Sequence, residues 1–176
     1  MTTTAEKARS RAPVLGFPNP VNELAARTVA AGVLLLSLLT LALSLAVSSR
    51  WLWLSVALAY GFFARVLTGP KLSPLGQLAT RMIAPRLGPP KLVAGPPKRF
   101  AQSIGATVTL TTVIFVAVGL AGAAEVLLGV MVVFATLESV FGYCVGCKIF
   151  GALMQAGLVP AATCEACANI SLRAAL

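Results

Sequence analysis

The sequence predicts an all-α protein: a bundle of four transmembrane helices with an amphipathic helix in its middle loop and a short helical hairpin after the last span. The first observation behind this prediction is composition, because 58% of the 176 residues are hydrophobic and only 11% are charged, which is far too apolar for a soluble domain. The second is that the apolar residues gather in four long runs. We therefore expect an N-terminal tail over 1–24, a membrane bundle over 25–143 and a cysteine-rich hairpin over 144–176.

The first two runs cover 25–47 and 51–67 and are separated by a short Ser-Ser-Arg turn. At about 1.5 Å per helical residue, runs of this kind cross a hydrocarbon core of roughly 30 Å. Trp51 and Trp53 open the second run, where indole rings favour the headgroup boundary. We expect the first run to be a retained span, because its apolar core is longer than that of a cleaved signal peptide.

The third and fourth runs cover 104–120 and 125–143, and only a small link of alanine and glycine separates them. Short links join antiparallel neighbours, so the four spans are expected to form two tight hairpins in one compact bundle.

The loop between the hairpins, 68–103, is basic and too polar to be buried. Within it, helical spacing places four apolar residues on one side: Leu75, Leu78, Ala79 and Met82. This predicts a short amphipathic helix that lies on the membrane surface. A Gly-Pro-Pro-Lys sequence then occurs twice, at 88–91 and 95–98, and is expected to be extended because proline disrupts a helix interior. The segment is interpreted either as a basic linker or as a docking strand for a cytoplasmic partner.

The distribution of positive charge predicts the orientation. Lysine and arginine lie mainly in the N-terminal tail and the middle loop, whereas the two short links together hold only Arg50. The positive-inside bias therefore places both termini and the middle loop in the cytoplasm. The net charge of +9 does not indicate a nucleic-acid partner, because the basic residues are not interleaved with stacking aromatics and instead flank apolar segments beside lipid.

Two Cys-x-x-Cys pairs contain all four cysteines of the chain and offer its most reactive side chains: Cys144, Cys147, Cys164 and Cys167. The first pair follows the fourth span, on a helix end that neighbouring glycines weaken. Thr163 is the predicted N-cap of a helix that begins at the second pair, which makes Cys164 the expected nucleophile, since a helix N-terminus stabilises a thiolate. A fold at Pro160 would bring the pairs together. In the cytoplasm, where thiols stay reduced, a transient role is expected rather than a permanent disulfide.

Two chemical interpretations of these cysteines remain open. One is thiol or sulfur-transfer chemistry. The other is a structural zinc site held by all four thiolates, because the spacing Cys-x2-Cys-x16-Cys-x2-Cys falls in the range of such sites. Against zinc, the intervening residues are apolar and helical, and neither pair is followed by the glycine common in metal-binding knuckles.

A carboxylate inside the fourth span also requires an explanation. Glu138 would cost several kcal/mol there if it were unpaired. Arg65 lies at a similar depth in the second span, so we expect the two to form an ion pair within the bundle. The alternative is a proton-handling role for Glu138 beside the dithiol. Together with Arg27, these charges also raise the weaker possibility of a transporter for a sulfur species.

The run Phe-Gly-Tyr-Cys-Val-Gly-Cys-Lys-Ile-Phe at 141–150, supported by Lys-Arg-Phe-Ala-Gln at 98–102, resembles the bacterial domain-of-unknown-function family 4395. The likeness covers residues 19–168. It implies a bacterial inner-membrane setting, and it carries Cys144 and Cys147 over as the family motif. Members tend to be encoded near thioredoxin-like and rhodanese-like proteins, which implies thiol or sulfur chemistry by association. The role of the second pair rests on the local sequence alone.

The layout is also similar to that of the disulfide-forming and vitamin K epoxide reductase groups, which pass electrons between a dithiol and a quinone. This is an analogy of layout only. Those enzymes use cysteines on the outer face, and no quinone pocket is evident in the sequence.

The sequence thus predicts a membrane dithiol protein that exchanges electrons or sulfane sulfur with a soluble thioredoxin-like or sulfurtransferase partner. In the expected mechanism, Cys164 attacks the partner's disulfide or persulfide and Cys167 resolves the adduct. Cys144 and Cys147 then receive the electrons or sulfur at the membrane surface. The alternative is a non-enzymatic membrane anchor whose four-cysteine zinc site helps to dock a partner.

Overall fold

The computed structural model of the protein describes residues 16–160 and Thr163. Within them, four helices are long and apolar enough to cross a membrane, as the sequence predicts. They are α2 (Glu23–Ala46), the helix Ser49–Thr68, α6 (Gly95–Ala117) and α7 (Ala121–Ser139). The second begins as the 3₁₀ helix η3 (Ser49–Leu54) and continues as α3 (Ser55–Thr68).

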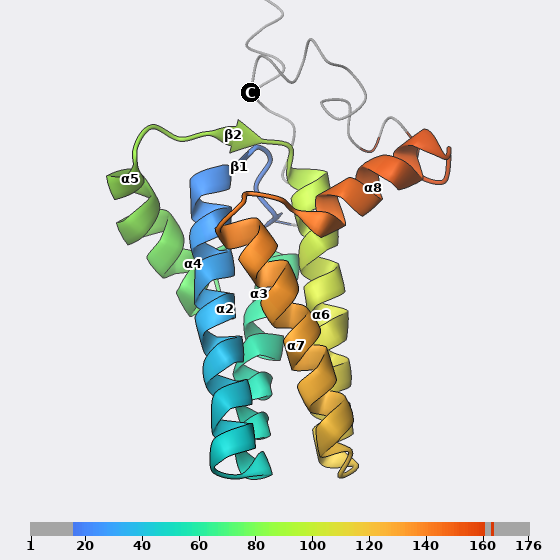
Figure 1. Cartoon of the computed structure of the whole chain (residues 1–176). Helices are drawn as coiled ribbons and strands as arrows, with labels where there is room; N and C mark the ends of the chain where they lie inside the picture. The colour runs from blue at the N-terminus through green and yellow to red at the C-terminus, as the bar shows by residue number, and fades with distance from the viewer. Residues whose placement is uncertain (1–15, 161–162, 164–176) are drawn as a thin grey trace, which may run out of the picture.

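Both hairpins open toward the same end of the bundle. Helices α2 and α6 begin at this end, α3 and α7 return to it, and α8 (Val145–Gln155) extends sideways from it (Figure 1). We call it the cysteine end, and the opposite end, which carries the two short links, the link end. Residues 16–22, the middle loop and the first cysteine pair therefore share one end, as the predicted hairpins require.

The two hairpins pack against each other in the core. Helix α2 packs mainly against α7, and α3 packs mainly against α6, so each hairpin has its principal partner in the other. Close packing of α3 on α6 depends on Gly105, because a Cβ there would lie 2.2 Å from Cε1 of Phe62. The largest apolar side chains of the core cluster are Val29, Val33, Leu52, Leu58, Phe62, Leu128 and Met131.

The third span starts earlier than the sequence suggested. The second Gly-Pro-Pro-Lys repeat was expected to be extended, but it forms the first turn of α6, which begins at Gly95 rather than at Ile104. Proline is compatible with this position because the first N–H groups of a helix have no intrahelical partner to lose. Asn19 caps the turn, since its Oδ1 accepts the Gly95 N–H at 3.0 Å. As a result, Lys98 lies on a helix and is buried.

The fourth span ends at Ser139 rather than at Tyr143. Arg27 on α2 stabilises this end, donating to the Ser139 carbonyl at 3.1 Å and to the Val140 carbonyl at 2.8 Å. A cation at the last carbonyls of a helix is stabilising, because it offsets the partial negative charge of the helix C-terminus. The chain then turns at Gly142, whose φ of +66° favours glycine, and enters α8. Helix α8 ends at Gln155, just before Gly157.

The predicted amphipathic helix in the middle loop is present, and its predicted apolar side is divided between buried and exposed positions. It comprises α4 (Pro74–Leu78), the π-helical turn η4 (Ala79–Ile83) and α5 (Ala84–Leu87), and it packs against α2. Ala79 and Ala84 are buried, whereas Leu78 and Met82 are exposed. The π turn adds a residue and shifts the helical register, which a strict 3.6-residue period does not anticipate.

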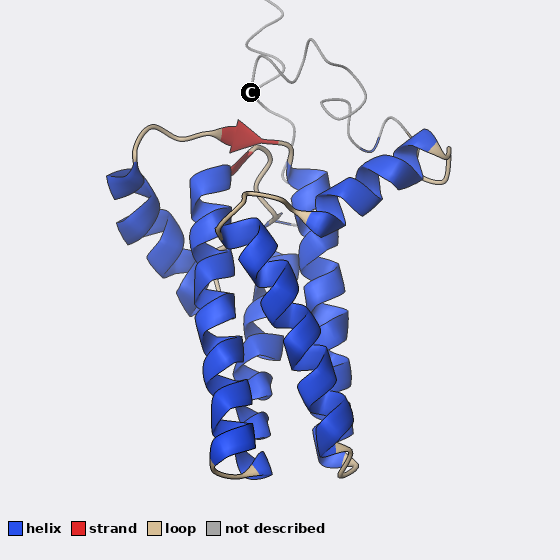
Figure 2. Cartoon of the chain, viewed as in Figure 1, coloured by secondary structure: helices blue, strands red, loops and turns tan. Residues whose placement is uncertain are grey.

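A two-residue β ladder lies at the cysteine end, beside the helix of the middle loop. β1 (Val21–Asn22) pairs antiparallel with β2 (Leu92–Val93), as Figure 2 shows in red. Lys91 joins the same region to the start of α2 through an ion pair with Glu23 at 2.9 Å. The first Gly-Pro-Pro-Lys repeat is non-helical, as expected, and leads into β2.

Candidate functional site

The first cysteine pair opens helix α8. Cys144 is the N-cap residue, and its Sγ accepts the backbone N–H of Cys147 at 3.3 Å. Both cysteines are free thiols. Backbone N–H groups and the helix dipole together favour a thiolate at this position. The sequence was interpreted as a dithiol on a weakened helix end, with a helix N-terminus only at Cys164, but Cys144 itself occupies one.

The pKa values of the two thiols are shifted in opposite directions. A hydrogen bond from the Cys147 thiol lowers the pKa of Cys144 below its ordinary value, with further help from the Lys98 ammonium, although burial and Glu138 act in the opposite direction. The same hydrogen bond, followed by burial, raises the pKa of Cys147. Cys144 is buried and Cys147 is only partly buried. The pair therefore combines a buried thiol that ionises more readily with a more accessible thiol that keeps its proton more strongly.

The ion-pair partner of Glu138 is Lys98, not the predicted Arg65. Lys98 Nζ lies 2.7 Å from Glu138 Oε1, and only 8% of the Lys98 residue is exposed. The prediction was wrong because residues 95–98 were assigned to an extended loop, which left Arg65 as the cation at matching depth. Once α6 begins at Gly95, Lys98 faces the end of α7.

Arg65 is instead held by neutral side chains. Its Nε donates to Gln102 Oε1 at 2.8 Å, and its Nη1 donates to Ser73 Oγ at 3.2 Å. The guanidinium also lies 4.5 Å from the centre of the Phe62 ring. Arg65 is 5% exposed, and within the described chain its Nη2 is buried without a hydrogen-bond partner.

Sequence reasoning did not assign Gln102 or Ser73 to the site. A signal for Gln102 did exist, because an amide at the start of an apolar transmembrane run needs a partner. Ser73 offered no comparable signal, since a serine before proline is usual at the start of a helix.

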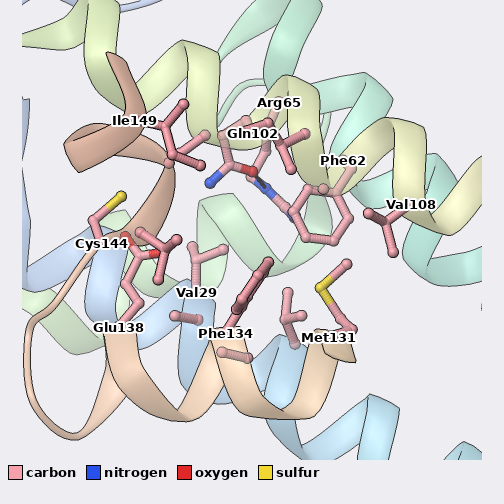
Figure 3. A pocket seen from close by; sticks show the side chains of 18 residues that line it. Val29, Phe62, Arg65, Gln102, Val108, Met131, Phe134, Glu138, Cys144 and Ile149 are labelled. Carbon is pink, nitrogen blue, oxygen red and sulfur yellow. Dashed lines mark hydrogen bonds between the residues drawn. The ribbon is translucent and has the colours of Figure 1, made fainter. Parts of the chain in front are cut away.

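A cavity of about 70 Å³ lies inside the bundle beside Cys144. Its polar lining consists of Cys144, Glu138, Arg65 and Gln102. Figure 3 shows Cys144 and Glu138 at one end of the view and Val108 and Met131 at the other. The remaining walls are largely apolar and include Val29, Phe62, Val108, Met131, Phe134 and Ile149.

A second cavity, of about 770 Å³, borders the dithiol on its other side. Cys144 and Cys147 both line it, together with Lys98 and Lys148. Lys148 Nζ lies 5.6 Å from the centre of the Tyr143 ring. Cys144 thus borders both cavities, whereas Cys147 borders only the larger one.

The structure brings together four of the predicted site residues: Cys144, Cys147, Glu138 and Arg65 line one or both of these cavities. Cys164 and Cys167 lie outside the described residues, as does the helix that Thr163 was predicted to cap. The predicted convergence of the two pairs, and the four-thiolate zinc site that depends on it, also involve those undescribed residues.

Comparison with known proteins identifies a family for most of the chain. The model of a domain of unknown function (DUF4395) matches residues 21–155, a range that spans the four-helix bundle and α8. The match includes Cys144 and Cys147 and stops before the second pair. No curated protein and no solved structure matches the chain. The chain therefore belongs to the DUF4395 family.

Proposed function

We propose that this protein is a membrane-bound thiol–disulfide exchange protein whose Cys144 and Cys147 cycle between dithiol and disulfide with a soluble thioredoxin-like partner. The observation that carries the proposal is the placement of Cys144 at the N-terminus of α8, with the Cys147 N–H on its sulfur and the Lys98 ammonium nearby. These groups favour a thiolate, the form of cysteine that takes part in disulfide exchange.

The asymmetry of the pair supports a defined order of steps. A partner thiolate attacks Cys147 Sγ of the oxidised protein, because Cys147 is the more accessible sulfur. The Cys144–Cys147 bond breaks, and Cys144 departs as a thiolate, which the Cys147 backbone N–H, the N-terminus of α8 and the Lys98 ammonium stabilise. The second thiol of the partner then attacks the mixed disulfide and releases Cys147 as a thiol. Two electrons have entered the membrane protein, and the partner holds the new disulfide.

The proposed setting is the bacterial inner membrane with the cysteine end in the cytoplasm. This end carries the basic middle loop, while the link end carries Arg50 alone, and positive charge favours the cytoplasmic side. A cytoplasmic dithiol has access to thioredoxin-like proteins and to reducing equivalents. In this proposal, Cys164 and Cys167 are a second pair able to relay electrons to the first.

The test uses the full-length protein, purified anaerobically in detergent, oxidised and then mixed with reduced thioredoxin. We expect thiols to appear in pairs as thioredoxin becomes oxidised, and Cys164→Ser/Cys167→Ser to retain one such pair. In that background, Cys144→Ser should abolish the reaction. A thioredoxin variant that lacks its resolving cysteine should form a mixed disulfide, which peptide mapping should locate at Cys147.

Three other outcomes would replace the proposal. Exchange that is unchanged in Cys144→Ser would remove the first pair from the reaction. One zinc per chain, with four thiols that react only after chelation, would favour the zinc-stabilised anchor. Persulfide that accumulates on Cys144 with a rhodanese-like donor, without any reaction with thioredoxin, would favour sulfur transfer.

A further inference from the structure

The cavity beside Cys144 opens toward the outer surface of the bundle. Phe134 on α7 and Ile149 on α8 both line it, and they are 37% and 42% exposed. Large apolar side chains on the outer surface of a transmembrane bundle face lipid. A molecule dissolved in lipid against this surface would enter the cavity there, and Cys144 lines the same cavity.

The lining of the cavity includes a residue with a buried, unpartnered hydrogen-bond donor. Arg65 lines this cavity and also a third cavity beside α2, and within residues 16–160 its Nη2 is buried without an acceptor. Gln102 adds a second donor, since its Oε1 is occupied by Arg65 and its amide N–H group is left to bind elsewhere. A buried donor without a partner costs about 1–3 kcal/mol, so a ligand with a carbonyl-type oxygen would be favoured here.

The charges near the cavity balance when Cys144 is a thiolate, the form that the N-terminus of α8 and the nearby Lys98 favour. Arg65 and Lys98 then carry two positive charges, and Glu138 and Cys144 carry two negative ones. An anionic acceptor would leave an uncompensated charge in an apolar surrounding, which is costly. The ligand that fits is neutral.

The size of the cavity limits the buried part of such a ligand. A volume of about 70 Å³ is about half that of an engineered cavity known to hold benzene. The cavity therefore takes the carbonyl-bearing edge of one six-membered ring, with the rest of the ring and any hydrocarbon tail extending between Phe134 and Ile149.

We propose that this cavity binds the head group of a lipid-soluble quinone, which accepts the two electrons of the dithiol. This inference rests on the proposed function and names its electron acceptor. An S–S bond forms between Cys144 and Cys147, and two electrons pass to the quinone ring. The Cys147 thiol gives one proton to the ring oxygens, and the second comes from the Cys144 thiol or, when Cys144 is a thiolate, from water, which gives one quinol. Cys144 is suited to this step because it borders both this cavity and the one from which a soluble partner would approach.

The test follows anaerobic oxidation of the full-length reduced protein by decylubiquinone in lipid nanodiscs, with Cys164→Ser/Cys167→Ser as the background. This quinone is fully substituted, so thiols cannot add to its ring. We expect one quinol per dithiol. Val108→Phe fills the cavity, and its control, Leu110→Phe, adds the same ring to an exposed position on the same helix. Ile149→Trp narrows the opening without crowding the core.

Exchange with thioredoxin is measured on every variant, so that failure of the site is distinguished from failure of the dithiol. We expect Val108→Phe and Ile149→Trp to slow quinone reduction at least about tenfold while thioredoxin exchange stays within about twofold. Leu110→Phe should change neither rate. A protein that exchanges with thioredoxin but does not reduce decylubiquinone, or whose quinone reaction ignores both cavity variants, would overturn the inference and leave the proposed function standing. If the unsubstituted protein shows neither thioredoxin exchange nor quinone reduction, both this inference and the proposed function are overturned.

Discussion

At the residue scale, the two thiols of the Cys144 pair are distinguished by their positions in one helix turn. Cys144 is the N-cap residue and receives the Cys147 N–H, while Cys147 lies inside the first turn. The cap position offers hydrogen-bond donors to a thiolate, and the interior position does not. A local backbone feature thus assigns different chemical roles to two otherwise identical side chains.

The pKa of Cys144 should depend on the donor at position 147. Because a hydrogen bond from Cys147 is the largest cause of the lowered pKa, Cys147→Ala should raise the pKa of Cys144, and Cys147→Ser, which keeps a donor, should raise it less. A lowered pKa keeps the thiolate at lower pH, so the pH midpoint of Cys144 alkylation should move upward in the alanine variant. The measurement is the iodoacetamide rate against pH in the Cys164→Ser/Cys167→Ser background. Identical midpoints in both variants would contradict the assignment.

The ion pair between Lys98 and Glu138 should matter more than the one between Lys91 and Glu23. Glu138→Gln leaves a buried ammonium without a partner, which costs about 3–5 kcal/mol. Glu23→Gln is the matched control, because the Lys91 side chain is 71% exposed and an exposed pair contributes about 1 kcal/mol or less. Denaturant unfolding in mixed micelles would measure both. Equal losses of stability in Glu138→Gln and Glu23→Gln would show that burial does not determine how much the Lys98–Glu138 pair contributes.

At the element scale, the placement of α8 on α6 positions the dithiol. Gly146 contacts Ala101, and a Cβ added at Gly146 would lie 2.6 Å from the Ala101 Cβ. The rings of Phe100 and Phe150 reinforce this contact with centroids 5.6 Å apart. The contact between these helices holds Cys144 over the cavity beneath it.

Gly146→Ala should displace α8 and expose Cys144. The added methyl group overlaps Ala101, which predicts a loss of about 1–3 kcal/mol and faster maleimide labelling of Cys144. Gly151→Ala is the control on the same helix, because nothing lies within 4 Å of its added Cβ. Alanine should instead stabilise α8 there, by up to about 1 kcal/mol. Unfolding and labelling of both variants in the Cys164→Ser/Cys167→Ser background test this contact, and equal behaviour would argue against it.

At the scale of the whole molecule, interlocked hairpins bring distant segments to one end of the bundle. Lys98 from α6, Arg65 from α3, Glu138 from α7 and Cys144 from α8 meet there. Each of these four helices supplies an ionisable group to this end of the bundle. The site is therefore formed only when both hairpins are assembled.

The proposed orientation predicts which side of a bacterial membrane each end faces. In a variant that otherwise lacks cysteine, Ser49→Cys at the link end should react with a membrane-impermeant maleimide in intact spheroplasts. Cys147, as the only cysteine, should react in inverted vesicles and not in spheroplasts. The physical reason is the retention of positive charge in the cytoplasm. The reverse pattern would invert the proposed topology and separate the dithiol from cytoplasmic partners.

The sequence was sufficient to predict the features that depend on residues close together in the chain. Four apolar runs predict four spans because a bilayer requires about 20 apolar helical residues for each, and the structure has four such helices. The link lengths then require hairpins with a shared end. The Cys-x-x-Cys motif singles out the candidate site residues, and the family match contains the first pair.

Only the tertiary structure decided how those residues meet. Local propensity assigned two prolines to a loop, but Asn19 caps the turn that contains them, and Lys98 consequently became the partner of Glu138. The N-cap role of Cys144 depends on Arg27, a residue from another hairpin, which holds the end of α7 in place for the turn. The sequence by itself determined the spans, their pairing into hairpins and the identity of the thiols, because these follow from hydrophobicity and spacing along one segment. The ion pair, the cavity and the difference between the two thiols were decided by packing, because each arises from groups that lie far apart in the chain.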